Sequence, residues 1–177
     1  MKHIQAGFCS NVKLMLPLTK ESDFVIKELD LVDQSRKNKI IRAGDYTVTL
    51  YQSNCSKIHV TGVKNFEQIP SLLKFLSERI DLSIGQISEM YIVNNSTWHF
   101  QVKERIPLQR LAEFLNELST DVFSWKFNPQ KFPGLSIKWP QGCAILFNTG
   151  KINILGVKSP AEFFRIRMKV LYIIYTL

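Results

Sequence analysis

The side chains that could carry out catalysis lack the spacings that catalysis requires. The histidines have no cysteine or aspartate nearby at the spacing of a metal site or of a nucleophile with its base; they are His3, His59 and His99. Gly150-Lys151 does not complete a phosphate-binding loop, because Gly142 precedes Gly150 by eight residues instead of five. Four acidic residues fall at helical spacings typical of solvated faces, namely Asp23, Glu28, Glu113 and Glu117. We therefore expect no enzymatic activity, metal or cofactor.

The cysteines point to a reducing compartment. Cys9, Cys55 and Cys143 are odd in number and widely spaced, so they fit neither a disulfide framework nor a CxxC metal site. The sequence also contains no apolar run of about 18 residues and no signal-peptide pattern at its start. We expect buried, reduced thiols in a cytosolic or nuclear protein.

The charge favours a polyanionic partner. Twenty-three Lys and Arg against fifteen Asp and Glu leave a net charge of +8 and a pI near 9.5. Such a balance suits nucleic acid or a membrane surface. With 45% hydrophobic residues over 177 positions, the chain is predicted to fold as one domain or as two small halves packed together.

An internal repeat organises the chain. Residues 57–65 (KIHVTGVKN) reappear as residues 151–159 (KINILGVKS), with five of nine positions identical. Upstream, Arg42 precedes Tyr51 by nine residues, as Lys138 precedes Phe147. Asn11 and Asn95 each open an extended segment, and the offsets between halves are 84, 96 and 94 along the chain. We predict two repeats of roughly 85 residues, 1–84 and 85–177.

Each repeat is predicted to contain strands and helices. In the first we expect strands near 11–18, 39–43, 46–53 and 56–63 and helices near 21–31 and 66–80, with Pro70 leaving the start of the second helix uncertain. In the second we expect strands near 89–103, 134–139, 142–148 and 151–157 and a helix near 107–118. A final helix is favoured over a strand, although FFRIRMKV alternates, because Ser159 and Glu162 form a capping-box pattern. In addition, Phe163, Ile166, Val170 and Ile173 would share one helical face.

These elements predict an α+β fold with one curved, mostly antiparallel sheet and helices on one face. Alternation along the matching strands directs Ile58, Val60, Ile152 and Ile154 toward the helices. The intervening residues would face the open side, where a basic, uncovered sheet forms a binding surface.

The segment Phe132-Pro133-Gly134-Leu135, followed by CAILFNTGKINILGVKS at 143–159, resembles the second repeat of the TATA-box-binding protein family. The duplicated layout extends this resemblance over nearly the whole chain. The resemblance implies a pseudo-twofold saddle, with helices on the convex face, that binds and bends duplex DNA through an A·T-rich minor groove. The degree of divergence is similar to that of homologues from large DNA viruses or divergent protists.

The resemblance also implies roles for individual residues. In the second repeat, Phe132 and Phe147 match the phenylalanines that wedge between base steps. In the first, the wedge positions fall on Arg36, assigned by spacing, and Tyr51. Asparagines at the central bases match Asn11 and Asn95. Phosphate contacts match Arg42 and Lys138, together with Lys57 and Lys151. The full set expected at the DNA is Asn11, Lys13, Arg42, Tyr51, Lys57, His59, Thr61, Asn95, Thr97, Phe132, Pro133, Lys138, Phe147, Lys151, Asn153 and Leu155.

The sequence departs from the family pattern at two places. Lys13, His59, Thr97 and Asn153 replace small apolar side chains, which weakens the fit to A·T pairs. The acidic residues that contact transcription factor IIB in the family are here Asn128, Gln130 and Lys131, so that contact is lost or altered. The implied partners remain double-stranded DNA and transcription factors or RNA polymerase subunits, without a membrane. The implied location is the nucleus, or a cytoplasmic viral factory for a virus-encoded protein.

Alternative interpretations stay open at this point. The phenylalanines could be core aromatics, the asparagines could be strand-end turn residues and the lysines could be plain surface residues. The chain could be a protein-interaction module without DNA binding, a single-strand or RNA binder, or a recognition domain of a nucleic-acid enzyme.

Overall fold

The computed structural model describes residues 7–17, 38–51, 57–78, 83–118 and 122–177. The chain divides into two compact units, one formed by Ser10–Asn95 and the other by Ser96–Leu177 together with Met1–Cys9. The division falls inside strand β5 (Ile92–Gln101). The predicted repeat boundary between 84 and 85 stays a prediction, because a compact unit need not coincide with a sequence repeat. The helix expected at 21–31 lies outside the described residues.

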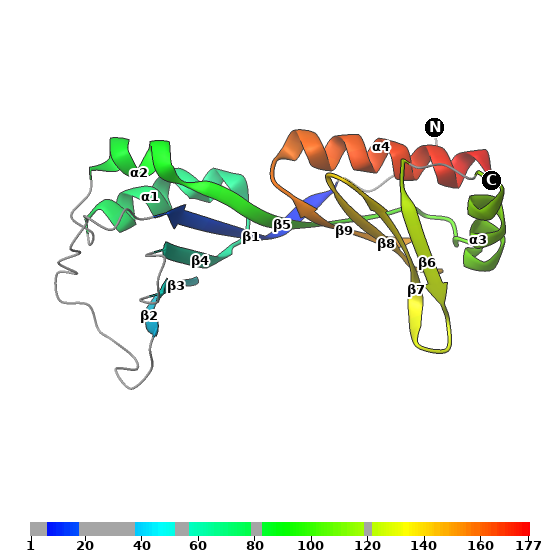
Figure 1. Ribbon diagram of the computed structural model, residues 1–177, viewed down its shortest axis with the longest axis horizontal. Coiled ribbons are helices and arrows are strands. Elements are labelled where there is room, and N and C mark those ends of the chain that lie inside the picture. The colour runs from blue at the N-terminus through cyan, green and yellow to red at the C-terminus, as the bar shows by residue number, and fades with distance from the viewer. Residues whose placement is uncertain (1–6, 18–37, 52–56, 79–82, 119–121) are drawn as a thin grey trace. The chain divides into compact units, whose positions relative to one another are not determined.

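The first unit is built on an antiparallel sheet with the strand order β2-β3-β4-β1. Its strands are β1 (Phe8–Pro17), β2 (Asn38–Ala43), β3 (Tyr46–Tyr51) and β4 (Lys57–Val63). A short 3-10 helix η1 (Phe66–Gln68) leads into α1 (Ile69–Ser77), and α2 (Ile84–Met90) follows. Figure 1 shows α1 and α2 on the same side of β1 and β4. Apolar residues of α1 and of alternate strand positions are buried there, as the predicted core requires.

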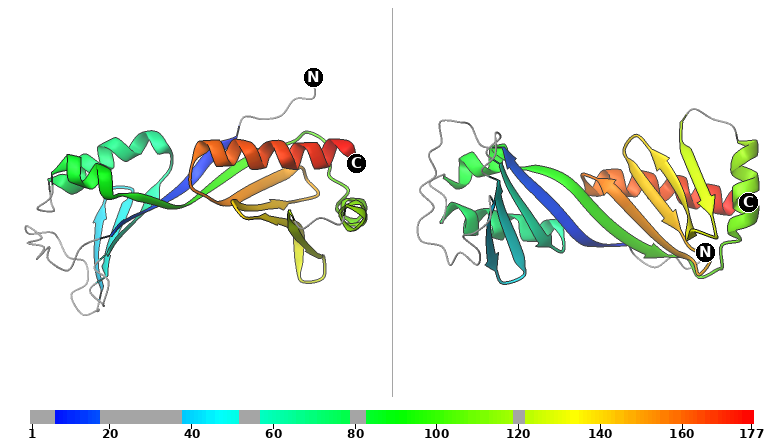
Figure 2. Two further views of the ribbon diagram at one scale, coloured as in Figure 1. Left: turned by 45° about the horizontal axis from the view of Figure 1, so that its top comes forward. Right: turned by 60° about the horizontal axis from the view of Figure 1, so that its bottom comes forward.

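The second unit has the strand order β5-β9-β8-β7-β6, again antiparallel. Its further strands are β6 (Ser124–Asn128), β7 (Phe132–Trp139), β8 (Gly142–Leu146) and β9 (Lys151–Val157). Helix α3 (Leu108–Glu117) contacts β7, and α4 (Pro160–Thr176) runs along β9 and β8 (Figures 1 and 2). In the core, Phe163 of α4 stacks on Trp98 of β5, with ring centroids 4.3 Å apart.

Strand register follows the offsets of the sequence repeat. Leu14 pairs with Val60 in the first unit, and Trp98 pairs with Ile154 in the second, at the offsets of 84 and 94 read from the sequence. Both sheets contain a bulge in this strand pair, and each bulge contains a left-handed glycine, Gly62 at φ +90° and Gly156 at φ +85°. A side chain is disfavoured in that conformation, so the repeat preserves a backbone requirement.

Most predicted elements are present, with local corrections. The predicted helix at 66–80 is split into η1 and α1. Because α1 begins at Ile69, Pro70 lies in its first turn, where proline is tolerated. The strand expected from residue 89 begins at Ile92, after the unpredicted helix α2. Strand β6 was also not predicted.

The final helix is confirmed, and its cap differs slightly from the expected box. The Ser159 hydroxyl accepts a hydrogen bond from the Glu162 amide at 3.2 Å. The Glu162 carboxylate accepts from the amide of Lys158 at 2.7 Å, one residue before the amide that a capping box uses. The four predicted apolar residues of α4 are buried. Among the described residues, no helix combines the length and hydropathy needed to cross a membrane.

Candidate nucleic-acid interface

One face of the second sheet is not covered by its helices. Strand alternation sends Trp98, Phe100, Ile152 and Ile154 into the core under α4. The residues between them face the other way. Across β5, β9, β8 and β7 the register aligns a second set, which we call the open face: Thr97, His99, Gln101, Ser136, Lys138, Cys143, Ile145, Phe147, Lys151, Asn153 and Leu155. The predicted orientation of Lys151, Asn153 and Leu155 agrees with this register.

Two aromatic rings lie side by side on this face. The rings of Phe132 and Phe147 have centroids 5.9 Å apart and an interplanar angle of 67°. Phe132 is 46% exposed and Phe147 is partly exposed, so neither ring is a core aromatic. Gly134 makes the arrangement possible, because a Cβ there would lie 2.7 Å from Cε1 of Phe132 and 3.2 Å from Cε1 of Phe147. The pair is an apolar protrusion on a polar face.

A polar pair lies on the adjoining strands of the same face. His99 and Asn153 are register partners, and Oδ1 of Asn153 accepts a hydrogen bond from Nδ1 of His99 at 2.7 Å. Sequence reasoning placed Asn153 at the interface but did not select His99. The missing signal was long-range strand pairing, since the two residues are 54 positions apart. The alternation of Thr97 and His99 was the only local hint.

Exposed lysines border the open face. Lys138 and Lys151 are exposed, as expected of phosphate-binding residues, and Lys126 of β6 joins them through its pairing with Ser136. Sequence reasoning missed Lys126 because β6 was not predicted. Burial raises the pKa of the Cys143 thiol, and the nearby positive charge of Lys138 partly opposes that rise. Cys143 is therefore a neutral thiol beside a cation.

In the first unit, the equivalent sheet face brings together several predicted residues. His59 pairs with Met15 on one side and with Thr49 on the other. Thr47 links Thr61 to the exposed Arg42. Lys13 is half-buried and Asn11 is exposed on β1, while Asn95 is half-buried on β5. The backbones of Tyr51 and Lys57 pair with each other, as Phe147 and Lys151 do in the second unit. Arg36 lies outside the described residues.

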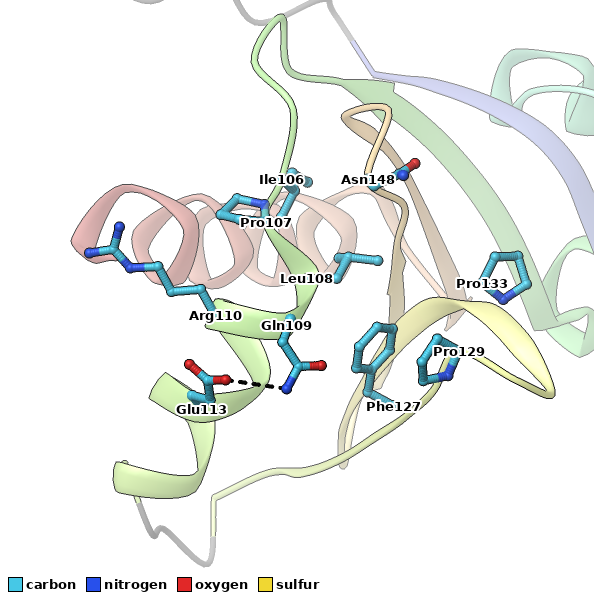
Figure 3. A pocket seen from close by; sticks show the side chains of 10 residues that line it. All are labelled: Ile106, Pro107, Leu108, Gln109, Arg110, Glu113, Phe127, Pro129, Pro133 and Asn148. Atoms are coloured by element: carbon cyan, nitrogen blue, oxygen red, sulfur yellow. Dashed lines mark hydrogen bonds between the residues drawn. The ribbon is translucent and has the colours of Figure 1, made fainter.

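Pro133 is placed apart from the open face. It follows Phe132 on β7, so alternation turns it away from the phenylalanine pair. It lines a groove of about 650 Å³ between the start of α3 and the β6–β7 hairpin (Figure 3). The other lining residues are Ile106, Pro107, Leu108, Gln109, Arg110, Glu113, Phe127, Pro129 and Asn148. The structure therefore does not group Pro133 with the remaining candidate DNA-binding residues.

The two units define the protein as a duplicated α+β protein in which the described helices of each half lie on one face of an antiparallel sheet and leave the other face uncovered. Comparisons with known proteins identify the protein family. Residues 90–177 match the family model described as "Transcription factor TFIID (or TATA-binding protein, TBP)". The chain is a divergent TATA-box-binding-protein-like protein, which confirms the resemblance seen in the sequence.

The individual relatives are distant. A TATA-box-binding protein of Thermoplasma acidophilum is 24% identical over 118 residues, which cover 64% of this chain and 61% of that protein. The match thus spans less than two thirds of that relative. The solved structure titled "Methanococcus jannaschii TBP" has a TM-score of 0.68 at 16% identity and covers 97% of this chain and 99% of that one. This likeness confirms the predicted fold class. Argininosuccinate synthase of Buchnera aphidicola is 25% identical over 51% of this chain, but over only 23% of that enzyme.

Proposed function

We propose that this protein is a transcription initiation factor that binds and bends duplex DNA through the minor groove. The observation that carries the proposal is the exposed Phe132–Phe147 pair on a sheet face bordered by lysines. Proteins that bend DNA from the minor groove combine these two features. The lysines neutralise phosphates, and the apolar rings fill the gap between two unstacked base pairs. Asn11 and Asn95 are proposed to read base edges.

The polar residues of the open face influence which base pairs the bound minor groove can contain. The minor groove presents the acceptors A N3 and T O2, and a G·C pair adds the N2 amino donor of guanine. The His99–Asn153 pair brings both donor and acceptor capacity to the middle of the second sheet face. We therefore propose a weaker A·T preference than an apolar face would give. The expected nuclear or viral-factory location and the absence of enzymatic activity stay predictions.

The proposal is tested by titrating the full chain with fluorescent duplex DNA, single-stranded DNA and RNA of one sequence. We expect the duplex to bind most tightly. If about four to six phosphates are neutralised, log K should fall against log salt with a slope of roughly −4 to −5. A flat salt dependence, or no duplex binding at about 50 mM salt, would overturn the proposal.

The same titration separates the other candidates. Preferential binding of RNA or single-stranded DNA would favour a sheet on which unpaired bases stack. Absence of binding to all three would favour an interaction module that has kept the fold alone. Within the DNA proposal, Phe132→Ala with Phe147→Ala should weaken duplex binding, whereas Val122→Ala serves as control because Val122 is an exposed apolar residue before β6.

A further inference from the structure

Helix α4 has a second apolar face that the described residues of its own unit leave exposed. Phe164, Met168 and Tyr172 succeed one another every four residues, with exposed fractions of 53%, 65% and 70%. Residues four apart stand above one another on a helix, so the three side chains form a stripe about 12 Å long. Tyr175 continues it at 39% exposure. We call Phe164, Met168 and Tyr172 the α4 stripe.

The stripe is not explained by packing on the sheet. The opposite face of α4 supplies the core through Phe163, Ile166 and Val170, all at most 1% exposed. The Phe163 and Phe164 rings touch, with centroids 5.2 Å apart, so the stripe begins at the edge of the core and extends outward. An aligned set of large exposed apolar side chains is typical of a surface that contacts a partner. A partner that buries two helical turns would match its length.

The charges around the stripe are positive along its first half. Arg165 and Lys169 follow Phe164 and Met168 directly, and both are exposed. Within the described residues neither of these cations takes part in an ion pair. Arg167 is directed elsewhere, since its guanidinium carbon lies 5.5 Å from the centre of the Phe100 ring. The stripe is thus flanked by two cations that are open to a partner.

Among the described residues, negative groups lie at the two ends of the helix. The Glu162 carboxylate accepts the Lys158 amide at the first turn. At the last turn, burial raises the pKa of Tyr175, and the nearby negative charge of Glu104 raises it further. A partner that lies along Phe164 and Met168 therefore meets positive charge, and one that reaches Tyr175 meets a carboxylate.

The apolar stripe and its flanking cations distinguish between three possible binding partners. A second copy of α4 would place Arg165 and Lys169 against their own like charges, which disfavours self-association. Nucleic acid would satisfy the cations but would leave a stripe of one aromatic, one thioether and one phenol side chain without apolar contacts. An amphipathic segment with acidic residues beside its apolar face satisfies both the stripe and the cations.

We infer that the α4 stripe docks an acidic amphipathic helix of another protein. Apolar side chains of the partner bury Phe164, Met168 and Tyr172, and its carboxylates pair with Arg165 and Lys169. Because α4 packs on the face opposite the open face of the same sheet, a docked helix leaves the open face uncovered. The inference does not depend on DNA binding.

The test uses the full chain and a fluorescein-labelled synthetic helix. The acidic peptide carries Leu at four-residue spacing with flanking Glu, and its twin carries Lys in place of every Glu. By fluorescence anisotropy we expect the acidic peptide to bind with a Kd of about 10 µM and the basic twin to bind at least about tenfold more weakly. Met168→Ser with Tyr172→Ser should raise the Kd for the acidic peptide about tenfold.

Matched variants identify the charges. Lys169→Glu should weaken acidic-peptide binding about fivefold and improve binding of the basic twin. Lys74→Glu is the control, because Lys74 is an exposed lysine on α1 of the other unit. Equal binding of both peptides, equal effects of the two charge reversals, or self-association abolished by the serine pair would each overturn the inference. Circular dichroism confirms that each variant retains its helices.

Discussion

At the scale of single residues, Gly134 is the position where the open face is most sensitive to one added atom. An added Cβ meets Ile145 Cγ2 at 2.9 Å as well as the edges of both phenyl rings. These neighbours are side chains that can turn aside, so we expect Gly134→Ala to cost only about 1–2 kcal/mol in the free energy of unfolding. Because the phenyl rings would be displaced, the variant should bend DNA clearly less even though it remains folded. Urea unfolding and a bend measurement on the same variant check the prediction, and unchanged bending would contradict it.

Asn95 and Lys151 should respond differently to removal. A base-reading amide is worth roughly 1–3 kcal/mol of discrimination, so Asn95→Ala should relax the preference for particular base pairs. Lys151→Ala should weaken binding to all duplexes alike and reduce the salt slope by about one. Affinities for an A·T-rich and a G·C-rich duplex at several salt concentrations give both quantities. Equal, sequence-independent losses would show that Asn95 does not read bases.

Residue identities and alternation were enough to place much of the open face. Lys151, Asn153 and Leu155 alternate with buried isoleucines, which a single strand reveals by itself. The His99–Asn153 hydrogen bond could not be predicted in this way, because it depends on the register of two strands far apart in sequence. Pro133 was predicted for the same surface because its motif was transferred whole, and the structure places it beside the start of α3, since the residue after Phe132 in a strand faces the opposite side.

At the scale of elements, the two glycine bulges provide a matched comparison. Both glycines have positive φ, which costs an alanine roughly 1–2 kcal/mol. A Cβ on Gly62 would in addition collide with the backbone carbonyl of Asp45, whereas the nearest atom to one on Gly156 is Cα of Gly142 at 3.6 Å. Gly62→Ala should therefore destabilise the protein clearly more than Gly156→Ala. Gly44→Ala, with φ +57° and nothing within 4 Å, isolates the backbone cost. Denaturant unfolding of the three variants tests the order, and equal losses would contradict it.

An ion pair with a defined pH dependence joins Asp45 in the β2–β3 turn to Lys64, which directly follows β4. Lys64 Nζ lies 2.8 Å from Asp45 Oδ2, and this contact lowers the pKa of Asp45 and raises that of Lys64. A lowered carboxyl pKa stabilises the fold above the pKa of the unfolded chain, and the stabilisation disappears as the pH falls through the lowered value. Asp45→Asn should therefore differ from the wild type near pH 7 and converge with it in acid. Because the pair is exposed, added salt should shrink the difference. Thermal unfolding across pH measures both effects, and a difference that grows in acid would contradict the assignment.

The missed elements have short or irregular signals. Helix α2 occupies only seven residues, and its start at Ser83 and Gln86 is a capping box that uses glutamine. Strand β6 alternates over five residues, too few to distinguish a strand from a loop without its partner β7. By contrast, α4 was predictable in spite of its strand-like alternation, because its cap and its buried face agreed.

At the scale of the whole molecule, the fold was predictable because the chain repeats itself. Because the pattern occurs twice, most strands and helices could be predicted from two separate sequence segments. The FPGL and LFNTGKINILG segments linked that pattern to a known fold. The role of the positions at which the two repeats differ could not be predicted from one sequence. That role depends on the ligand, which the sequence does not identify.

The divergence predicts an asymmetric deformation of DNA. The second half has phenylalanines at both proposed wedge positions, whereas the first has Tyr51 and Arg36 at the matching sequence positions. Inserting arginine between bases would desolvate its charge, so we expect one sharp kink and one gentle deformation. The total bend should be smaller than the roughly 80° of a TATA-box-binding protein with all wedges.

Fluorescence transfer between the ends of a duplex measures that bend. Phe132→Ala with Phe147→Ala should straighten the DNA markedly, and Tyr51→Ala should straighten it only slightly. Equal straightening by both variants, or none from the phenylalanine pair, would show that the wedge roles were wrongly transferred.

The paired bulges at Gly62 and Gly156 have a consequence for evolution. After a duplication, the backbone conformation was retained in both copies, while side chains at matching positions on the sheet diverged, as His59 and Asn153 did. Two identical halves would recognise a duplex equally well in either direction along its axis. Under the proposed function, the difference between the halves should favour one orientation of the bound protein on DNA over its reverse. A conserved backbone with diverging side chains can thereby turn a symmetric ancestor into a protein that binds DNA in one preferred orientation.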